Sequence, residues 1–406
     1  MKKAALLAGV VAAALVSASG FASDLFDRIN AGRYKAVLAD CAACHTKPGG
    51  RPFAGGTPLD TPFGKLIPSN ITPDRETGIG NWSYADFRGA LKEGVGKGGK
   101  RLYPAMPYPA YSAMTEADIA DLWAYLQKIE PVSNRVVSNQ LPFPFSIRTV
   151  MIGWNLLNFS PSEFKPDPAR SAEWNRGAYL VNGPAHCGTC HTPKSLLGAD
   201  KTDQFLRGGN LQSWVAPDIT NDAHKGIGGW AAEDIVAYLK TGANRFDIAS
   251  GPMAEVVANS TQYWTDADLN AVATYLKDIK GAGTAPPRPL DAGDPLMLAG
   301  KAVFIDRCSA CHVSSGEGAP FLFPKLAKAP VVNGDDPTSL IRVVLEGSQA
   351  GATKARPTTP AMPSFAWNLG DAEVANVLSY VRNSWGNAAP AVTPAQVKDM
   401  RTKLAR

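Results

Sequence analysis

Apolar residues recur at steps of three and four residues in three long stretches that share one pattern. The stretches are MTEADIADLWAYLQKI (114–129), WTDADLNAVATYLKDI (264–279) and LGDAEVANVLSYVRNSW (369–385). This spacing places the apolar side chains along one face of a helix. Each stretch begins with a cap-like residue beside acidic residues, as helices commonly do. These residues are Thr115, Thr265 and Gly370. We therefore predict three amphipathic helices.

A shorter helical pattern containing a glycine precedes each of these helices. The glycines lie in AGRYKAVLADCAACH, RGAYLVNGPAHCGTCH and AGKAVFIDRCSACH. A glycine lets a second backbone approach closely, and each long helix carries a tyrosine at an equivalent place that can fill the crossing. We predict the helix contacts Gly32/Tyr125, Gly177/Tyr275 and Gly300/Tyr380. We interpret the tyrosines as core-packing residues, with a redox-relay role as the alternative.

The repeats divide the chain into three similar domains, and the predicted fold class is all-α. The first two domains share a further block, SNITPDRETGIGNWSYADFRGALKEG (69–94) and APDITNDAHKGIGGWAAEDIVAYLKTG (216–242). We place the domains at residues 23–140, 169–283 and 291–388. An apolar connecting segment (141–168), a linker (284–290) and a C-terminal tail (389–406) complete the predicted organisation.

The first residues have the pattern of an export signal. Lys2 and Lys3 precede an apolar run from Ala4 to Val16, and Gly20 and Ala22 offer small residues for cleavage. The run is shorter than the roughly twenty residues that cross a bilayer. We predict that residues 1–22 are a cleaved signal peptide and that the mature chain is periplasmic.

The six cysteines form three pairs, and each pair belongs to a CxxCH motif. Two thiols three positions apart can add to the two vinyl groups of a haem, and the following histidine is then placed under the iron. Disulfides and zinc sites also use CxxC. Three copies that all end in histidine instead predict three covalently bound haem c groups. The residues are Cys41, Cys44 and His45, then Cys187, Cys190 and His191, and finally Cys308, Cys311 and His312.

A methionine recurs at one place in the three repeats, and we predict that it is the distal iron ligand. Met106 in YPAMPYP, Met253 in SGPMAEV and Met362 in TPAMPSF each lie on a proline-rich loop just before or near the closing helix. A stiff loop that carries a thioether suits His/Met coordination. A single methionine is more often a gap filler in a core, but the recurrence favours the ligand.

Other candidate ligands fit the repeats less well. Met114 aligns with Trp264 and Leu369 at the start of the closing helix, which argues against it. Only His186 and His224 lie outside the motifs, too few for three bis-histidine haems. We interpret His186 as a local hydrogen-bonding residue and His224 as a solvated loop residue.

Trp82 and Trp230 follow a Gly-Ile-Gly turn at equivalent positions. Their indole N–H groups are candidates to donate to a haem propionate, and a half-buried structural aromatic is the alternative. The formal net charge of +5 falls toward neutral or slightly acidic after loss of Lys2 and Lys3 and addition of haem propionates. A basic run with interleaved aromatics is absent from the sequence, which excludes a nucleic-acid partner.

The motifs NITPD, DITND, LYPAMPYPAY and GPMAEVV, together with the three CxxCH motifs, resemble those of the cytochrome subunit of membrane-bound bacterial dehydrogenases. That family serves quinoprotein alcohol dehydrogenases and flavin-dependent gluconate, sorbitol or fructose dehydrogenases. The resemblance implies three tandem class I cytochrome c domains and a partner catalytic subunit, a quinoprotein or flavoprotein rather than a molybdenum protein. It also implies electron delivery to ubiquinone or the respiratory chain at the outer face of the cytoplasmic membrane.

The residues leave two other functions open. One is a free-standing periplasmic electron carrier, and the other is a haem peroxidase-type enzyme, which would need an open iron position. With three closed sites we expect no catalytic residues for substrate oxidation in this chain. The apolar stretch 141–164 is a candidate docking or interdomain packing strip that does not span a membrane, because it contains Arg148 and is flanked by prolines. The tail is expected to form a short basic helix that packs on the third domain, with contact with the bilayer as the alternative.

Overall fold

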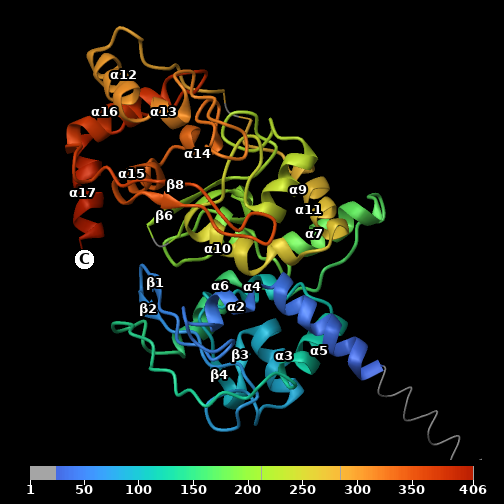
Figure 1. The fold of residues 1–406 in the computed structure, drawn as a ribbon. Helices are drawn as coiled ribbons and strands as arrows, with labels where there is room; N and C mark the ends of the chain where they lie inside the picture. Colours follow the sequence, from blue (N-terminus) through green and yellow to red (C-terminus); the bar gives the residue numbers. More distant parts are fainter. Residues whose placement is uncertain (1–23, 212, 284, 406) are drawn as a thin grey trace, which may run out of the picture. The chain divides into compact units, whose positions relative to one another are not determined.

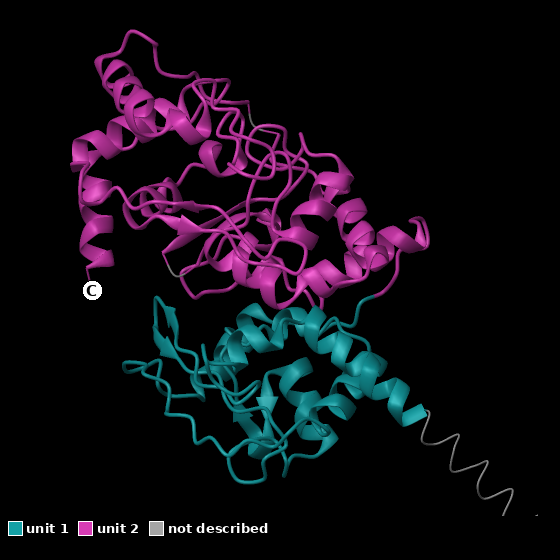
Figure 2. Cartoon of the chain, in the orientation of Figure 1, with its two compact units in different colours: residues 1–164 teal, residues 165–406 magenta. Residues whose placement is uncertain are grey.

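The computed structural model describes residues 24–211, 213–283 and 285–405 (Figure 1). The predicted signal peptide, residues 1–22, lies outside these residues. The chain forms two compact units, which divide between Phe164 and Lys165 (Figure 2). The first CxxCH motif lies in unit 1, and the second and third lie in unit 2.

Unit 1 is mostly helical, with two small hairpins. Residues 24–38 are helical, followed by the short helix that carries the first motif. The named helices are α2 (Cys41–His45), α3 (Tyr84–Glu93), α4 (Tyr108–Tyr111), α5 (Glu116–Leu126) and α6 (Val150–Asn158). The antiparallel pairs are β1 (Leu59–Thr61) with β2 (Gly64–Leu66), and β3 (Val95–Gly96) with β4 (Lys100–Arg101). The core gathers buried residues of α3 and α5, among them Phe87, Leu91, Ile119 and Leu122.

Unit 2 contains two successive groups of helices. The first comprises α7 (Ala172–Asn182), α8 (Gly188–His191), α9 (Ala232–Thr241), α10 (Gly251–Asn259) and α11 (Asp266–Asp278), with the hairpin β5 (Arg207–Leu211) and β6 (Trp214–Asp218). The second comprises α12 (Pro295–Arg307), α13 (Ser309–His312), α14 (Pro330–Asn333), α15 (Thr338–Glu346), α16 (Asp371–Arg382) and α17 (Pro394–Leu404), with the hairpin β7 (Ser348–Gln349) and β8 (Ala361–Met362).

The three predicted amphipathic helices are confirmed as α5, α11 and α16. The side chains of Thr115 and Thr265 accept the backbone N–H groups of Asp118 and Asp268 at their starts. Gly370 has no side chain to offer, and its own N–H donates to the Glu373 carboxylate at 2.8 Å. In each case a polar group satisfies a helix-terminal backbone group that has no partner within the helix.

The predicted glycine–tyrosine crossings are also confirmed. A Cβ added to Gly32 would lie 1.9 Å from the Asp121 carbonyl oxygen and 2.8 Å from the Cβ of Tyr125. The same atom on Gly177 would lie 2.8 Å from the Cβ of Tyr275, and on Gly300 it would lie 2.7 Å from the Cβ of Tyr380. Only a residue without a side chain allows the paired helices to approach this closely.

The four two-stranded sheets in the described residues depart from a purely helical fold. Their strands are two to five residues long, and most are shorter than the roughly four residues needed for alternation of apolar and polar residues to identify a strand. Each pair is antiparallel, and β7 and β8 hold Met362 opposite Ser348. The chain is thus mostly helical, with hairpins that position loops.

The predicted tail helix is confirmed as α17, which packs on the core of unit 2. Val397 and Met400 are buried among residues of α16 such as Val374 and Leu378. The Arg401 guanidinium forms an ion pair with Asp371 at 2.7 Å. The tail therefore belongs to the folded unit.

Part of the apolar connecting segment forms α6. Some side chains of the segment are buried in unit 1, and others are exposed. Met151 and Trp154 are buried, whereas Phe143 and Leu156 are 80% and 84% exposed. The Tyr108 hydroxyl donates to the Asn155 side chain at 2.6 Å, which fastens α6 to α4. Among the helices of the described residues, none combines the length and apolarity that crossing a membrane requires.

Candidate haem-binding sites

The thiols of each CxxCH motif are placed on one helical turn. Cys41 begins α2, Cys187 directly precedes α8, and Cys308 joins α12 to α13. Residues three apart on a helix lie on the same face, so the two thiols of a motif lie beside each other. No disulfide joins any of the six cysteines in the described residues.

Burial keeps the first thiol of each motif protonated. Desolvation raises the pKa of Cys41 and of Cys187 to about 12. It raises the pKa of Cys308 to about 11. No three His, Cys, Asp or Glu side chains in the described part of the chain are grouped as a zinc site would need. The first thiol of each motif is therefore of low spontaneous reactivity, and its covalent attachment to haem stays a prediction.

The histidine of each motif is held by a backbone carbonyl. The Nδ1 atom lies 2.6 Å from the Ser69 carbonyl oxygen in His45, 2.7 Å from that of Pro217 in His191, and 3.0 Å from that of Pro324 in His312. A carbonyl oxygen only accepts, so Nδ1 carries the proton and Nε2 keeps its lone pair. The tautomer of a metal-binding histidine is usually fixed in this way, by a hydrogen bond from its other ring nitrogen.

Burial also keeps these imidazoles neutral. Desolvation lowers the pKa of His45, His191 and His312 below the usual value, against the smaller raising effect of the carbonyl contacts. A neutral imidazole with a free Nε2 is the form that binds iron.

Sequence reasoning missed these carbonyl acceptors, because a backbone group leaves no mark on residue type. A signal was nevertheless present for two of them. Ser69 and Pro217 occupy equivalent places in the repeated block, in SNITPD and PDITND. The repetition therefore marks the segment that supports the motif histidine.

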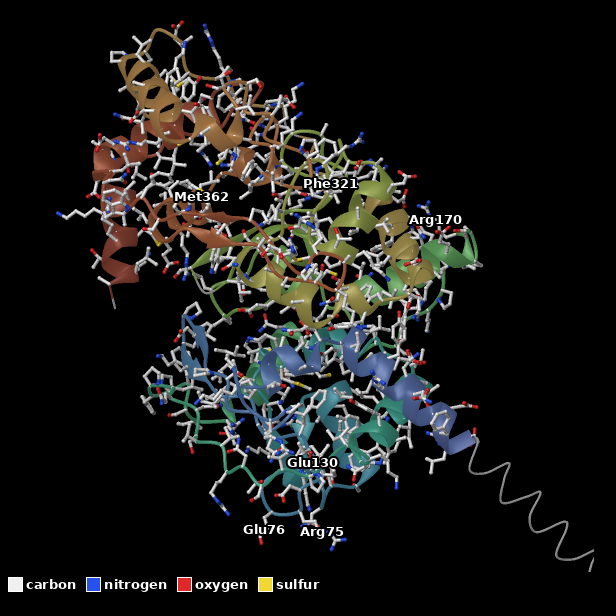
Figure 3. All side chains as sticks on the ribbon, in the orientation of Figure 1. Arg75, Glu76, Glu130, Arg170, Phe321 and Met362 are labelled. Atoms are coloured by element: carbon white, nitrogen blue, oxygen red, sulfur yellow. The ribbon has the colours of Figure 1, made fainter. Side chains whose placement is uncertain are left out.

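The third motif faces a cavity that brings all the predicted residues of its site together. Cys308, Cys311, His312 and Met362 line an empty space of about 790 Å³. The rest of the wall is largely apolar and includes Phe323, Pro324, Val343 and Phe365. Met362 lies in unit 2, on β8 (Figure 3). Two thiols, an imidazole and a thioether around an apolar cavity fit a haem c group with His/Met ligands.

The methionines predicted for the other two sites lie in different secondary structure, one in a loop and one in a helix. Met106 is partly buried in the loop before α4 and packs on the same core cluster as Cys41. Met253 lies in the first turn of α10, where the sequence predicted a loop. Pro252 explains the difference, because proline is tolerated in the first turn of a helix and not only in loops. The ligand roles of Met106 and Met253 stay predictions.

The structure also bears on the interpretations of Met114 and His224. Met114 is completely buried in the core. Trp264 and Leu369, at the equivalent places, are 3% and 6% exposed. This agrees with a packing role for Met114. His224 lies on a loop as expected, but the residue is only partly exposed and its Nε2 lies 3.0 Å from the Ala388 carbonyl oxygen. The repeat could not reveal that contact, because Ala388 belongs to a different repeat.

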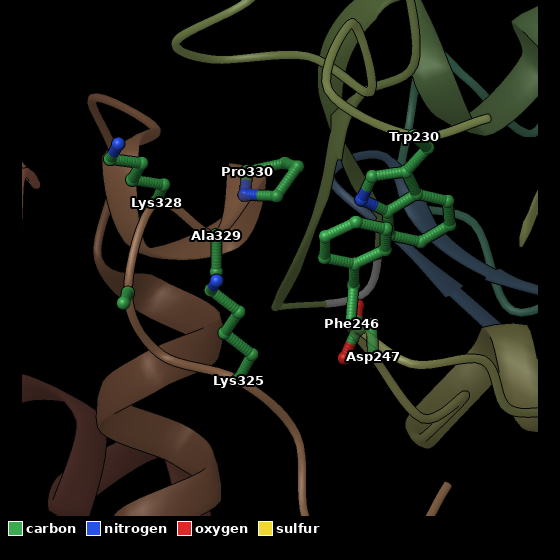
Figure 4. Close-up of a pocket in the computed structure, with 8 residues that line it drawn as sticks. Trp230, Phe246, Asp247, Lys325, Lys328, Ala329 and Pro330 are labelled. Atoms are coloured by element: carbon green, nitrogen blue, oxygen red, sulfur yellow. The ribbon is translucent and has the colours of Figure 1, made fainter. Parts of the chain in front are cut away.

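Trp230 is buried and stacks on Phe246, with ring centroids 5.7 Å apart and an angle of 6° between the planes. The pair lines a small cavity together with Asp247 and Lys325, and Figure 4 shows the two rings side by side. Trp82 is only half-buried and contacts Gly96. Donation from either indole to a haem propionate stays a prediction.

Comparisons with known proteins find a matching family and similar chains. The cytochrome c family matches residues 32–130, 175–280 and 297–385, and each match contains one CxxCH motif. The chain is 39% identical to the cytochrome c subunit of a quinone alcohol dehydrogenase from Gluconacetobacter polyoxogenes, over 92% of this chain and 84% of the relative. It is 38% identical to the gluconate 2-dehydrogenase cytochrome c subunit of Pantoea cypripedii, over 92% and 89%. It is 37% identical to the fructose dehydrogenase cytochrome subunit of Gluconobacter japonicus, over 92% and 82%.

Proposed function

The chain belongs to the cytochrome c family, and from this premise we propose that it is the three-haem electron-transfer subunit of a dehydrogenase at the outer face of a bacterial cytoplasmic membrane. The three family matches, each with its own CxxCH motif, support three haem c groups. The relatives named above are cytochrome subunits of alcohol, gluconate and fructose dehydrogenases, which supports a partner subunit that oxidises an alcohol or a sugar. The export-signal pattern at residues 1–22 supports the periplasmic side.

The observation that carries the proposal is the wall of the third cavity. Cys308 and Cys311 would hold the group through thioether bonds, while His312 and Met362 would bind its iron. When bound, haem c supplies one-electron redox chemistry. Met362 would fill the ligand position that a peroxidase-type enzyme keeps open, and a thioether ligand favours the reduced state. The residues of this site therefore suit electron transfer.

The motif histidine is held in the same way at all three sites. The carbonyls of Ser69, Pro217 and Pro324 hold each ring by Nδ1, so that Nε2 points away from the supporting segment as the ligand. The wall of the third site is largely apolar, and the polarity around a haem tunes its potential. We propose that Met106 and Met253 complete the first and second sites in the same way.

We propose that the partner is a quinoprotein or flavoprotein subunit and that ubiquinone or the respiratory chain receives the electrons. The relatives cover three substrates, so the substrate is selected by the partner and not by this chain. Attachment to the membrane surface would then run through the complex.

The experiment is purification from native membranes in mild detergent, followed by mass spectrometry and a haem assay. We expect three covalently bound haems per chain and a co-purifying flavoprotein or quinoprotein. Fewer than three haems would contradict the cofactor assignment. A three-haem chain that purifies without a dehydrogenase would instead indicate a free-standing carrier.

A further inference from the structure

The residue that follows each carbonyl support of a motif histidine has a different charge in each repeat. The carbonyls that hold the three histidines belong to Ser69, Pro217 and Pro324. The residues that come next in the sequence are Asn70, Asp218 and Lys325. One is neutral, one is acidic and one is basic. The three sites therefore share one kind of ligand support but differ in the charge beside it.

Asn70 and Asp218 make the same local hydrogen bonds. The Asn70 Oδ1 accepts the backbone N–H of Thr72 at 2.9 Å and the Thr72 hydroxyl at 2.8 Å. The Asp218 Oδ1 accepts the backbone N–H of Thr220 at 2.7 Å and the Thr220 hydroxyl at 2.6 Å. An amide and a carboxylate of this length have nearly the same shape, and only the carboxylate can carry a negative charge. Charge is therefore the main difference between these two positions.

Asp218 belongs to the hairpin of β5 and β6, which packs against the second motif. A Cβ added to Gly209 of β5 would lie 2.6 Å from the Cys190 carbonyl oxygen, so the hairpin and the motif are in close backbone contact. In β6 the Pro217 carbonyl accepts the Nδ1–H of His191 at 2.7 Å, and Asp218 is the next residue of the strand. The acidic residue is thus peptide-bonded to the group that fixes the predicted iron ligand.

The charges at the second and third sites are compensated to different degrees. The Lys325 ammonium forms an ion pair with Glu317 at 2.6 Å, which offsets its charge. In the described part of the chain, Asp218 has no such ion pair. Desolvation raises the pKa of the Asp218 carboxyl, while the hydrogen bonds from Thr220 and, more weakly, the charge of Arg207 lower it. Asp218 therefore places an acidic group beside its site that no ion pair neutralises.

We propose that Asp218 lowers the reduction potential of the second haem below that of the first, where the neutral Asn70 takes its place. This inference rests on the proposed function. Reduction adds one electron to a haem, so the oxidised haem carries one more positive charge. A nearby carboxylate stabilises the oxidised form, and this attraction is stronger at a partly buried position than in water. Two sites with the same predicted ligands therefore hold an electron unequally, and the first is reduced before the second.

The test is a redox titration of the full haem-loaded chain, with electron paramagnetic resonance of samples frozen at each potential to follow the haems separately. Asp218→Asn removes the charge and keeps the oxygen that accepts from Thr220. Asp266→Asn is the matched control, because it makes the same change of charge at a side chain that is 83% exposed. At a fixed potential we expect the ratio of reduced to oxidised form to rise severalfold for one haem in Asp218→Asn, and Asp266→Asn to titrate like the unaltered chain. Unchanged titration of Asp218→Asn, or equal shifts in both variants, would overturn the inference.

The reverse exchange tests the first site. Asn70→Asp should lower the potential of a different haem from the one that Asp218→Asn raises, because each change lies beside its own motif histidine. A shift of the same haem in both variants would overturn the inference. The Asn70 amide also donates to the Val132 carbonyl at 2.7 Å, so if Asn70→Asp does not fold, Asp218→Asn decides alone. A haem count below three in the unaltered chain contradicts the proposed function, whereas a full count with an unmoved titration in Asp218→Asn contradicts the role of Asp218 alone.

Discussion

The Nδ1–H of His312 donates to the Pro324 carbonyl at 3.0 Å. The corresponding histidines of the other two motifs are held in the same way, by Ser69 and Pro217. Because the acceptor is a backbone carbonyl, the proton is fixed on Nδ1 and the lone pair on Nε2 whatever side chain follows. All three repeats therefore fix the orientation of the motif histidine as well as the residue itself.

The first prediction concerns the first site. Met106→Leu should remove the thioether ligand and convert one of the three haems to a high-spin or weakly ligated form, with a lower potential. Met114→Leu is the matched control, because Met114 is fully buried in the core and leucine nearly conserves its volume. Absorption and redox titration of the two variants are the measurements. Loss of one His/Met signal in Met114→Leu, with Met106→Leu unchanged, would reverse the assignment.

The second prediction concerns the helix crossing in the second repeat. Gly177→Ala should destabilise the protein by about 2–4 kcal/mol, because the added Cβ would lie 2.0 Å from the Ala271 carbonyl oxygen. Thermal unfolding of the haem-loaded chain measures this. Gly153→Ala is the control, since it lies in α6 with no atom within 4 Å of the added Cβ. That change should be neutral or stabilise by up to about 1 kcal/mol. Similar melting temperatures for both variants would show that the crossing is looser than described.

The glycine–tyrosine crossings could be predicted because they depend on residue types repeated three times in the chain. Gly300 and Tyr380, for example, carry the same relationship as Gly177 and Tyr275. The starts of α5 and α11 were equally readable, since the threonine and the acidic residue that cap each helix are neighbours in sequence. Features that depend on sequence neighbours or on repeated residues could therefore be predicted from the sequence.

Contacts that occur once, or that use backbone atoms, could not be predicted. The Pro324 carbonyl has no side-chain signature, and the approach of His224 to Ala388 joins positions that are 164 residues apart. The β7–β8 pair has two residues in each strand, so periodicity cannot reveal it. The boundaries of the three domains and the ligand roles of the methionines stay predictions.

The third prediction concerns Asp247, which lies between Phe246 and Ile248 in unit 2. Desolvation raises the pKa of this carboxyl to about 6 from an ordinary value of 3.8. The folded protein therefore holds the proton between these pH values while the unfolded chain releases it, so the contribution of Asp247 to stability falls as pH rises from about 4 to about 6. Asp247→Asn should remove this dependence and raise stability at neutral pH by about 1–2 kcal/mol, after allowance for partial exposure of the side chain.

Denaturant unfolding at several pH values checks this prediction. The amide can still accept the Ile248 N–H that the Asp247 carboxylate accepts at 2.8 Å, so the loop should keep its shape. An unchanged pH profile in Asp247→Asn would mean that the carboxyl is solvated in the folded protein.

The fourth prediction concerns the C-terminal helix. Met400 is 3% exposed in the core of unit 2, so Met400→Ala should cost about 2–4 kcal/mol through lost burial and the cavity left behind. Lys398→Ala on the exposed face of the same helix is the control and should change stability by less than about 0.5 kcal/mol. Equal unfolding midpoints for the two variants would indicate that α17 is detached in solution.

The central claim is that all three sites are closed by a methionine and serve electron transfer. Electron paramagnetic resonance of the fully oxidised, haem-loaded chain tests it most directly, because iron with two strong axial ligands is low-spin and iron with an open position is high-spin. Three low-spin signals of equal intensity are expected, with one lost in each of Met106→Leu, Met253→Leu and Met362→Leu. A stoichiometric high-spin signal in the unaltered chain would contradict it and point to an open, peroxidase-type site.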